Sequence, residues 1–187
     1  MEHKKCCFIG HRNAKLDDNQ IKRLFLIIKK LISKYGFREF LFGSRSDFDK
    51  ICHQVVTELK NSEYSFLQRV VYTCRSEFCI YENKREEIEK LFSTNSNKVT
   101  FQGYEKEVEF KSKYVAGRNS YIDRNKQMID DSDFCVLFYD EDYLPNLKKK
   151  SKRDFLHYQP NSGTKIAYKY IVKKQKPFIN IFEKDKN

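Results

Sequence analysis

Glycine and small polar residues lie between apolar runs and helical patterns at three places in the sequence. The segment 10–12 (Gly-His-Arg) follows the apolar run 5–9, the segment 43–49 follows the run 37–42, and the segment 162–164 (Ser-Gly-Thr) opens a helical pattern. A small-residue turn at a helix start leaves backbone N–H groups free to bind an anion such as phosphate. We therefore predict a ligand site built from these turns. The expected contacts are Gly10, His11, Arg12, Gly43, Ser44, Ser162, Gly163 and Thr164.

Four side chains near these turns are candidates for ligand chemistry, and each has a structural alternative. Arg12 and Arg124 suit phosphate or carboxylate groups because the guanidinium presents a planar fork of donors, but either can make an ordinary surface contact. His11 can contact a ligand or be a turn residue that hydrogen-bonds to the backbone. Asp49 can accept hydrogen bonds from ligand hydroxyls. Asp47 or Asp49 can also cap the helix that follows, and capping is our prediction for Asp47.

Strand patterns alternate with helical patterns along the chain. The run 133–140 is apolar and rich in aromatic residues, which is typical of a strand buried on both faces of a parallel sheet. The apolar residues between 21 and 35 repeat at intervals of three and four, which predicts a helix with Asp17 or Asp18 as its cap and Gly36 at its end.

This alternation predicts one domain over residues 1–187, an α/β fold of the Rossmann-like, doubly wound kind. Its sheet is expected to be mostly parallel, with about five or six strands. Segment 105–113 is expected to be a solvated face or loop, because its charges alternate without an apolar stripe. The predicted strands are 5–9, 37–42, 68–73, 99–101, 133–140 and 178–182, and the predicted helices after the first lie near 47–59, 86–92, 118–131 and 164–176, where Pro177 ends the last one.

Several common signatures are absent from the sequence. It has neither the Gly-x-Gly-x-x-Gly of dinucleotide-binding folds nor the Gly-x-x-x-x-Gly-Lys-Ser/Thr of the P-loop, and no nucleophile elbow. The 6 cysteines form no Cys-x-x-Cys and no pair with zinc spacing. We therefore predict buried free thiols, no metal site and no cofactor.

The net charge of +11 is spread along the chain, with one dense basic cluster at 148–153. Such a charge either marks a polyanion-binding surface or only keeps the protein soluble. The cluster lies in the segment 140–162, a predicted loop long enough to be a lid or a solvated insertion. No apolar stretch reaches the roughly 20 residues that span a bilayer, and the first residues lack the apolar core of a signal peptide, so a cytoplasmic protein without a membrane partner is expected.

The ordered set of motifs resembles the SLOG superfamily, a modified Rossmann fold that includes the LOG phosphoribohydrolases and the DNA-processing protein A family. The similarity is nearest to small bacterial members that open with Cys-Phe-x-Gly-His-Arg, as residues 7–12 do here. The segment 43–49 is similar to the family's Gly-x-x-x-Gly-Phe-Asp turn. Arg118-Asn119, Met128, Ser132-Asp133 and Gly163-Thr164 also match. The resemblance covers nearly the whole chain and implies that Arg118 and Asn119 contact the ligand.

Two departures from the family pattern bear on function. The second glycine of the Gly-x-x-x-Gly turn is Asp47 here, which opposes close approach of a phosphate. Comparison with LOG enzymes places Arg124 on their catalytic arginine, but their catalytic glutamate corresponds to Ala167. Because alanine has neither a lone pair nor a proton to offer, the resemblance implies the ligand class more strongly than the reaction.

The sequence therefore predicts a module that binds or senses a nucleotide or nucleotide-derived ligand, without catalysis. One alternative is an N-glycosidase or phosphoribohydrolase that acts on nucleoside monophosphates with another carboxylate, such as Asp140 or Glu141. A second alternative is a nucleic-acid-binding protein of the DNA-processing type. A homo-oligomer is compatible with each of these three functions.

Overall fold

The computed structural model describes residues 3–43, 46–74, 103–110, 118–145, 148–149, 157–158 and 160–182. The predicted strand 99–101, the predicted helix 86–92 and the expected contact Ser44 lie outside these residues.

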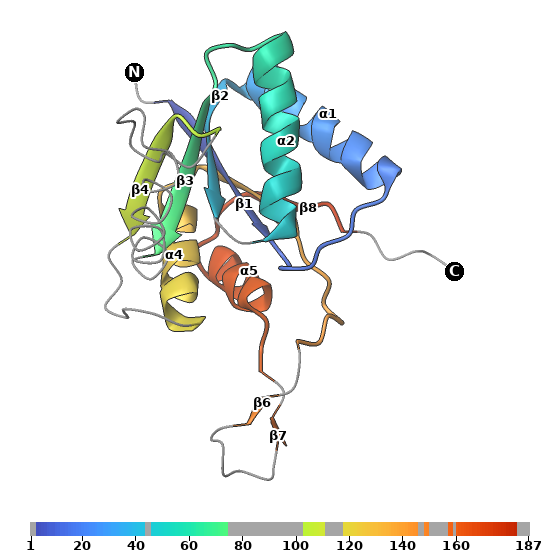
Figure 1. The fold of residues 1–187 in the computed structure, drawn as a ribbon, viewed down its shortest axis with the longest axis vertical. Helices are drawn as coiled ribbons and strands as arrows, with labels where there is room; N and C mark the ends of the chain where they lie inside the picture. The colour runs from blue at the N-terminus through green and yellow to red at the C-terminus, as the bar shows by residue number, and fades with distance from the viewer. Residues whose placement is uncertain are drawn as a thin grey trace, which may run out of the picture.

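Six parallel strands form one sheet in the order β4-β3-β2-β1-β5-β8, and helices cover both of its faces (Figure 1). The predicted α/β fold with a parallel sheet is therefore confirmed. The strands are β1 (Lys4–Gly10), β2 (Phe37–Gly43), β3 (Gln68–Cys74), β4 (Lys106–Phe110), β5 (Phe134–Phe138) and β8 (Phe178–Asn180). The helices are α1 (Asp18–Tyr35), α2 (Asp47–Ser62), α4 (Arg118–Asp130) and α5 (Gly163–Lys173).

Alternation along β1 shows how the sheet builds two cores. Phe8 points to the face covered by α1 and α2, where it packs with Phe48 of α2 and other apolar residues. Its neighbours Cys7 and Ile9 point to the opposite face and pack with residues of α4 and α5 such as Met128. This two-residue period places every strand side chain on one helix layer or the other, so the central strand is buried on both sides.

The predicted ends of α1 are confirmed. The Asp17 side chain accepts a hydrogen bond from the Gln20 backbone, and the Gln20 side chain accepts one from the Asp17 backbone, which together make a capping box. Gly36 ends the helix with φ of 75°, a left-handed conformation that glycine adopts without a steric penalty.

Two local predictions were wrong. Residues 106–110 form edge strand β4 instead of a loop, because pairing with β3 outweighs the weak pattern of an alternately charged segment. The cap of α2 is Ser46 and not Asp47, since the Ser46 hydroxyl accepts the backbone N–H of Asp49 at 2.9 Å. Asp47 is the first residue of the helix itself.

The long segment after β5 contains a second, two-stranded sheet. Strands β6 (Lys148–Lys149) and β7 (His157–Tyr158) pair antiparallel, and this ribbon projects from the main body beyond α5 (Figure 1). The first two lysines of the basic cluster thus lie on the ribbon, while residues 150–153 are outside the described part of the chain. No helix among the described residues is long and apolar enough to cross a membrane.

Candidate functional site

The strand order changes direction at the centre of the sheet. From β1 the chain builds β2, β3 and β4 on one side, and β5 and β8 lie on the other. In open parallel sheets such a switch point leaves a crevice at the carboxyl ends of the two central strands. A pocket of about 420 Å³ lies there, a volume within the range of small-molecule sites.

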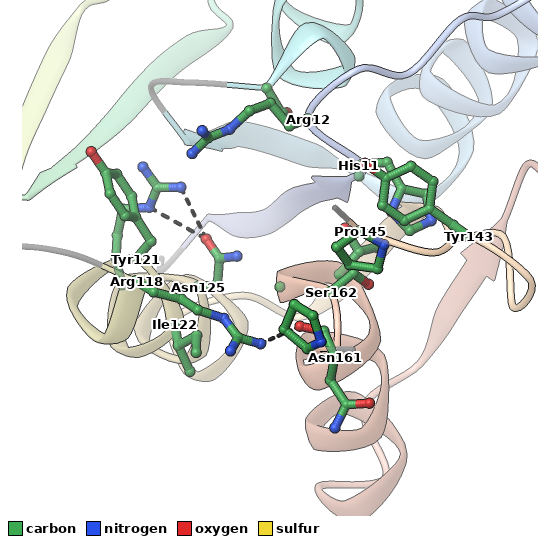
Figure 2. A pocket seen from close by; sticks show the side chains of 16 residues that line it. His11, Arg12, Arg118, Tyr121, Ile122, Asn125, Tyr143, Pro145, Asn161 and Ser162 are labelled. Atoms are coloured by element: carbon green, nitrogen blue, oxygen red, sulfur yellow. Dashed lines mark hydrogen bonds between the residues drawn. The ribbon is translucent and has the colours of Figure 1, made fainter. Parts of the chain in front are cut away.

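Residues from five parts of the chain line this pocket: the end of β1, the start of α2, one face of α4, the segment 143–145 and the segment 160–164 (Figure 2). Eight of the predicted contacts are among them. These are Gly10, His11, Arg12, Arg118, Arg124, Ser162, Gly163 and Thr164. The structure brings these residues together from both ends of the sequence, whereas Gly43, Asp49 and Asn119 are not among the lining residues.

The N-terminus of α5 presents a site for an anion. Ser162 caps the helix by accepting the backbone N–H of Lys165 at 2.9 Å, and the first turn contains no acidic residue. A β-carbon on Gly163 would meet no atom within 4 Å, so the backbone here is open to a ligand. Arg118, from the start of α4, donates a hydrogen bond to the carbonyl oxygen of Asn161 just before the cap. A guanidinium is thereby held beside the positive end of the α5 dipole.

The N-terminus of α2 also borders the pocket through Ser46, but it is electrostatically different. Its first turn carries Asp47 and Asp49. The backbone N–H of Asp47 already donates to the carbonyl of Arg12 at 2.8 Å, and the N–H of Asp49 donates to Ser46. Two carboxylates on the positive end of this helix oppose a bound anion, so α5 is the favoured of the two helix starts.

Asp49 and Arg124 lie together beneath the pocket. Asp49 is 6% exposed, and its carboxylate accepts hydrogen bonds from the N–H of Gly43 at 3.2 Å and from the hydroxyl of Ser46 at 2.6 Å. A β-carbon on Gly43 would lie 2.7 Å from Nη2 of Arg124 and 2.9 Å from Oδ2 of Asp49, so glycine leaves the space in which both groups meet. Burial raises the pKa of Asp49, and the positive charge of Arg124 acts against that rise.

Arg124 is itself 5% exposed. Its Nη2 and Nε donate to Oδ1 of Asn125 at 3.1 and 3.3 Å, and its guanidinium carbon lies 5.3 Å from the centre of the Tyr121 ring. These contacts fix the guanidinium at the pocket wall. Arg12 and Arg118 are instead exposed, which leaves them accessible to an anion in solution.

His11 forms part of the opposite wall. Its Nε2 accepts the backbone N–H of Asp140 at 3.0 Å, so the neutral ring carries its proton on Nδ1. Burial lowers the pKa of His11, which keeps the ring neutral at physiological pH. Tyr143 stacks on it with ring centroids 4.0 Å apart. The expected backbone hydrogen bond of His11 is therefore present, and the ring lines the pocket as well.

Two positions from the family comparison have structural roles. A β-carbon on Gly10 would come within 2.4 Å of the Phe48 ring, so glycine is needed there for core packing. Ala167 is 2% exposed in the apolar cluster that includes Met128 and Ile171, and it does not line the pocket. A carboxylate at position 167 would lie in the core of this fold.

Several lining residues were not predicted as contacts. Tyr121, Ile122 and Asn125 share the pocket face of α4 with Arg118, and their spacing of three, four and seven residues from it was the signal available in the sequence. The segment 143–145 and Pro160 carried no such signal. Their position depends on where the chain crosses the carboxyl end of β5.

The described cysteines are all buried free thiols, as predicted: Cys6, Cys7, Cys52, Cys74 and Cys135. Within the described ranges no three His, Cys, Asp or Glu side chains gather in a way that would hold a metal ion.

Comparison with known proteins shows that this fold is similar to solved structures. No protein-family model and no curated protein matches the chain. A structure of DNA processing protein A from Helicobacter pylori is similar, with a TM-score of 0.52 and 14% identity, covering 98% of this chain and 67% of that one. This likeness confirms a Rossmann-like α/β fold. The resemblance to the SLOG superfamily, and to its small bacterial members, stays a prediction.

Proposed function

We propose that this chain is a SLOG-like module, over residues 1–187, that binds or senses a nucleotide or nucleotide-derived small molecule. The ligand occupies the pocket between the carboxyl ends of β1 and β5. The observation that supports this most directly is the pairing of an acid-free helix start at α5 with Arg118, in a pocket of about 420 Å³. A phosphate there gains free N–H groups, a helix dipole and a guanidinium at once.

The lining residues support binding without catalysis. Among the described residues, those that line the pocket include no aspartate and no glutamate. Glycosidic cleavage of the LOG type needs a carboxylate for acid–base or electrostatic assistance. Neither Asp140 nor Glu141 is a lining residue, and one Asp140 oxygen accepts the backbone N–H of Asp142 at 3.0 Å. The module is therefore proposed as a binding or sensing protein, with cytoplasmic location and oligomeric state remaining predictions.

Titration calorimetry with nucleoside monophosphates tests this proposal. Replacing Arg118 by methionine removes the charge beside α5 while keeping an extended side chain, and we expect binding to weaken roughly 10- to 100-fold, the range for a lost charge-assisted hydrogen bond. The matched control neutralises Lys148, Lys149, Lys150, Lys152 and Arg153 together, which should leave affinity nearly unchanged. Wild-type protein that binds no nucleotide would refute the proposal, and release of free base from the nucleotide would favour the glycosidase alternative.

A nucleic-acid partner is the second candidate. The similar structure from Helicobacter pylori is described for its single-stranded DNA binding, and this chain carries a net charge of +11 with lysines on the β6–β7 ribbon. Binding of a phosphate chain weakens steeply with salt, because each neutralised phosphate releases counterions. This second candidate is favoured if single-stranded DNA binds tightly and in a salt-sensitive way. Neutralising the five basic residues of the cluster 148–153 should then abolish DNA binding while Arg118→Met does not, which would make the ribbon the DNA-binding surface.

A further inference from the structure

Asn125 holds a defined place relative to the proposed anion site. It lies on the pocket face of α4, seven residues after Arg118. At 1.5 Å per residue, this is roughly 10 Å further along the helix axis. A ligand that extends from its phosphate into the pocket can contact both side chains.

The amide of Asn125 is oriented by its neighbour. Two N–H groups of Arg124 donate to its Oδ1, at 3.1 and 3.3 Å. The opposite amide orientation would direct the NH₂ group at a guanidinium, donor against donor. The oxygen is therefore used, and Figure 2 shows the amide nitrogen of Asn125 on the side that faces the middle of the pocket.

Contacts with other residues fix the guanidinium of Arg124 in turn. It is almost fully buried, with the Asp49 carboxylate beside it at Gly43 and the Tyr121 ring against its guanidinium. A buried guanidinium with a nearby carboxylate has little freedom to turn. Asp49 and Arg124 therefore act as positioning groups, and Asn125 offers the pocket a fixed donor that meets no acceptor among the residues that the structure describes.

The far wall is suited to a planar ring. Tyr143 stacks on His11, and Pro145 continues this surface of neutral rings. Stacked aromatic and apolar surfaces bind heteroaromatic rings in preference to charged groups. The pocket thus has a cationic end at Arg118 and a wall of neutral rings at His11 and Tyr143, which match the phosphate and the base of one nucleotide.

We propose that Asn125 determines base specificity by donating from Nδ2 to an oxo group of the base. This rests on the proposed nucleotide-binding function and narrows its ligand class to nucleoside monophosphates whose base carries an oxo group at the contacted edge, as hypoxanthine, guanine and uracil do. A base that presents an amino group there, such as adenine, would oppose a donor with a donor.

The test compares inosine and adenosine monophosphate, whose bases differ in the 6-oxo and 6-amino groups. We expect the wild-type protein to bind inosine monophosphate roughly tenfold more tightly, about the value of one net hydrogen bond. Asn125→Asp keeps one oxygen on Arg124 and turns the pocket-facing group into an acceptor, so the preference should reverse. Asn125→Ala removes the donor and should bring the two affinities together.

The matched control is Gln127→Glu. Gln127 lies on the same helix and is not among the residues that line the pocket, so this variant adds the same charge to α4 and should keep the wild-type preference. Equal affinities for the two nucleotides, or an equal loss in Asn125→Asp, would overturn the assignment while leaving the proposed function intact. A wild-type protein that binds neither nucleotide would overturn both.

Discussion

Removing the charge of Arg124 should leave the buried Asp49 without its opposing charge. Asp49 keeps its hydrogen bonds from Gly43 and Ser46, but Arg124→Met removes the one cation, among the residues that the structure describes, that offsets its burial. Breaking a buried charge pair from one side typically costs about 3–5 kcal/mol. We expect a loss near 3 kcal/mol at pH 7, because those two hydrogen bonds remain, which for a chain of this size lowers Tm by roughly 6–12 °C.

The pH dependence identifies the cause. Burial already raises the pKa of Asp49 in the folded protein, so its ionisation costs stability as the pH rises above its unfolded pKa. Without Arg124 the folded pKa rises further, and the penalty at neutral pH grows. Lowering the pH from 7 toward about 4, the ordinary range of aspartate, protonates Asp49 and should bring the stability of the variant closer to that of the wild type.

Urea denaturation at pH 7 and at pH 5 measures this effect as the free energy of unfolding. The double variant Arg124→Met/Asp49→Asn is the control, since it removes both charges and should recover most of the lost stability. A loss that is the same at both pH values, or a double variant that is less stable than Arg124→Met, would show that Arg124 does not act through Asp49.

Two further predictions concern the positions that the family comparison singled out. Gly10→Ala forces a β-carbon against the Phe48 ring and should lower the unfolding free energy by about 1–3 kcal/mol. The control Gly163→Ala, which has open space around it, should change the unfolding free energy by less than about 0.5 kcal/mol. A Gly10→Ala variant as stable as the wild type would contradict this packing. Ala167→Glu should destabilise the fold because it buries a carboxylate in the α4–α5 core. The loss of unfolding free energy should be larger at pH 7 than at pH 5, and larger at pH 7 than the loss in Ala167→Gln. The variant should not release base from nucleotides in a chromatographic assay.

The parts of the fold that were predictable are those with strong local signals. The apolar run of β5 and the capping residues of α1 each specify their element without help from the rest of the chain. Strand β4 could not be predicted, because its alternating charges suit the solvent and only pairing with β3 makes it a strand. Ser46 was overlooked as the cap of α2 although a Ser-x-x-Asp spacing was present, since two nearby aspartates offered the same chemistry.

The site was predictable where a turn directly follows a strand or opens a helix, because parallel strands bring such turns to one edge. The orientation of Asn125 and the position of Tyr143 depend on tertiary contacts. The orientation of Asn125 depends on Arg124, which depends on the buried Asp49 from another helix. Tyr143 lies at the pocket because its segment turns back over His11. The sequence alone could not predict the places of these two side chains, because tertiary packing determines them.

The central position of β1 has a consequence for how the protein matures. Its partner β5 is far along the chain: the backbone N–H of Lys5 donates to Asp133 across a separation of 128 residues. During synthesis one edge of β1 therefore stays unpaired until β5 has been made. Contacts this distant in sequence slow folding, since a long loop must close first. The pocket forms only at that last step, so any nucleotide that binds there recognises the finished sheet and stabilises the molecule as a whole by mass action.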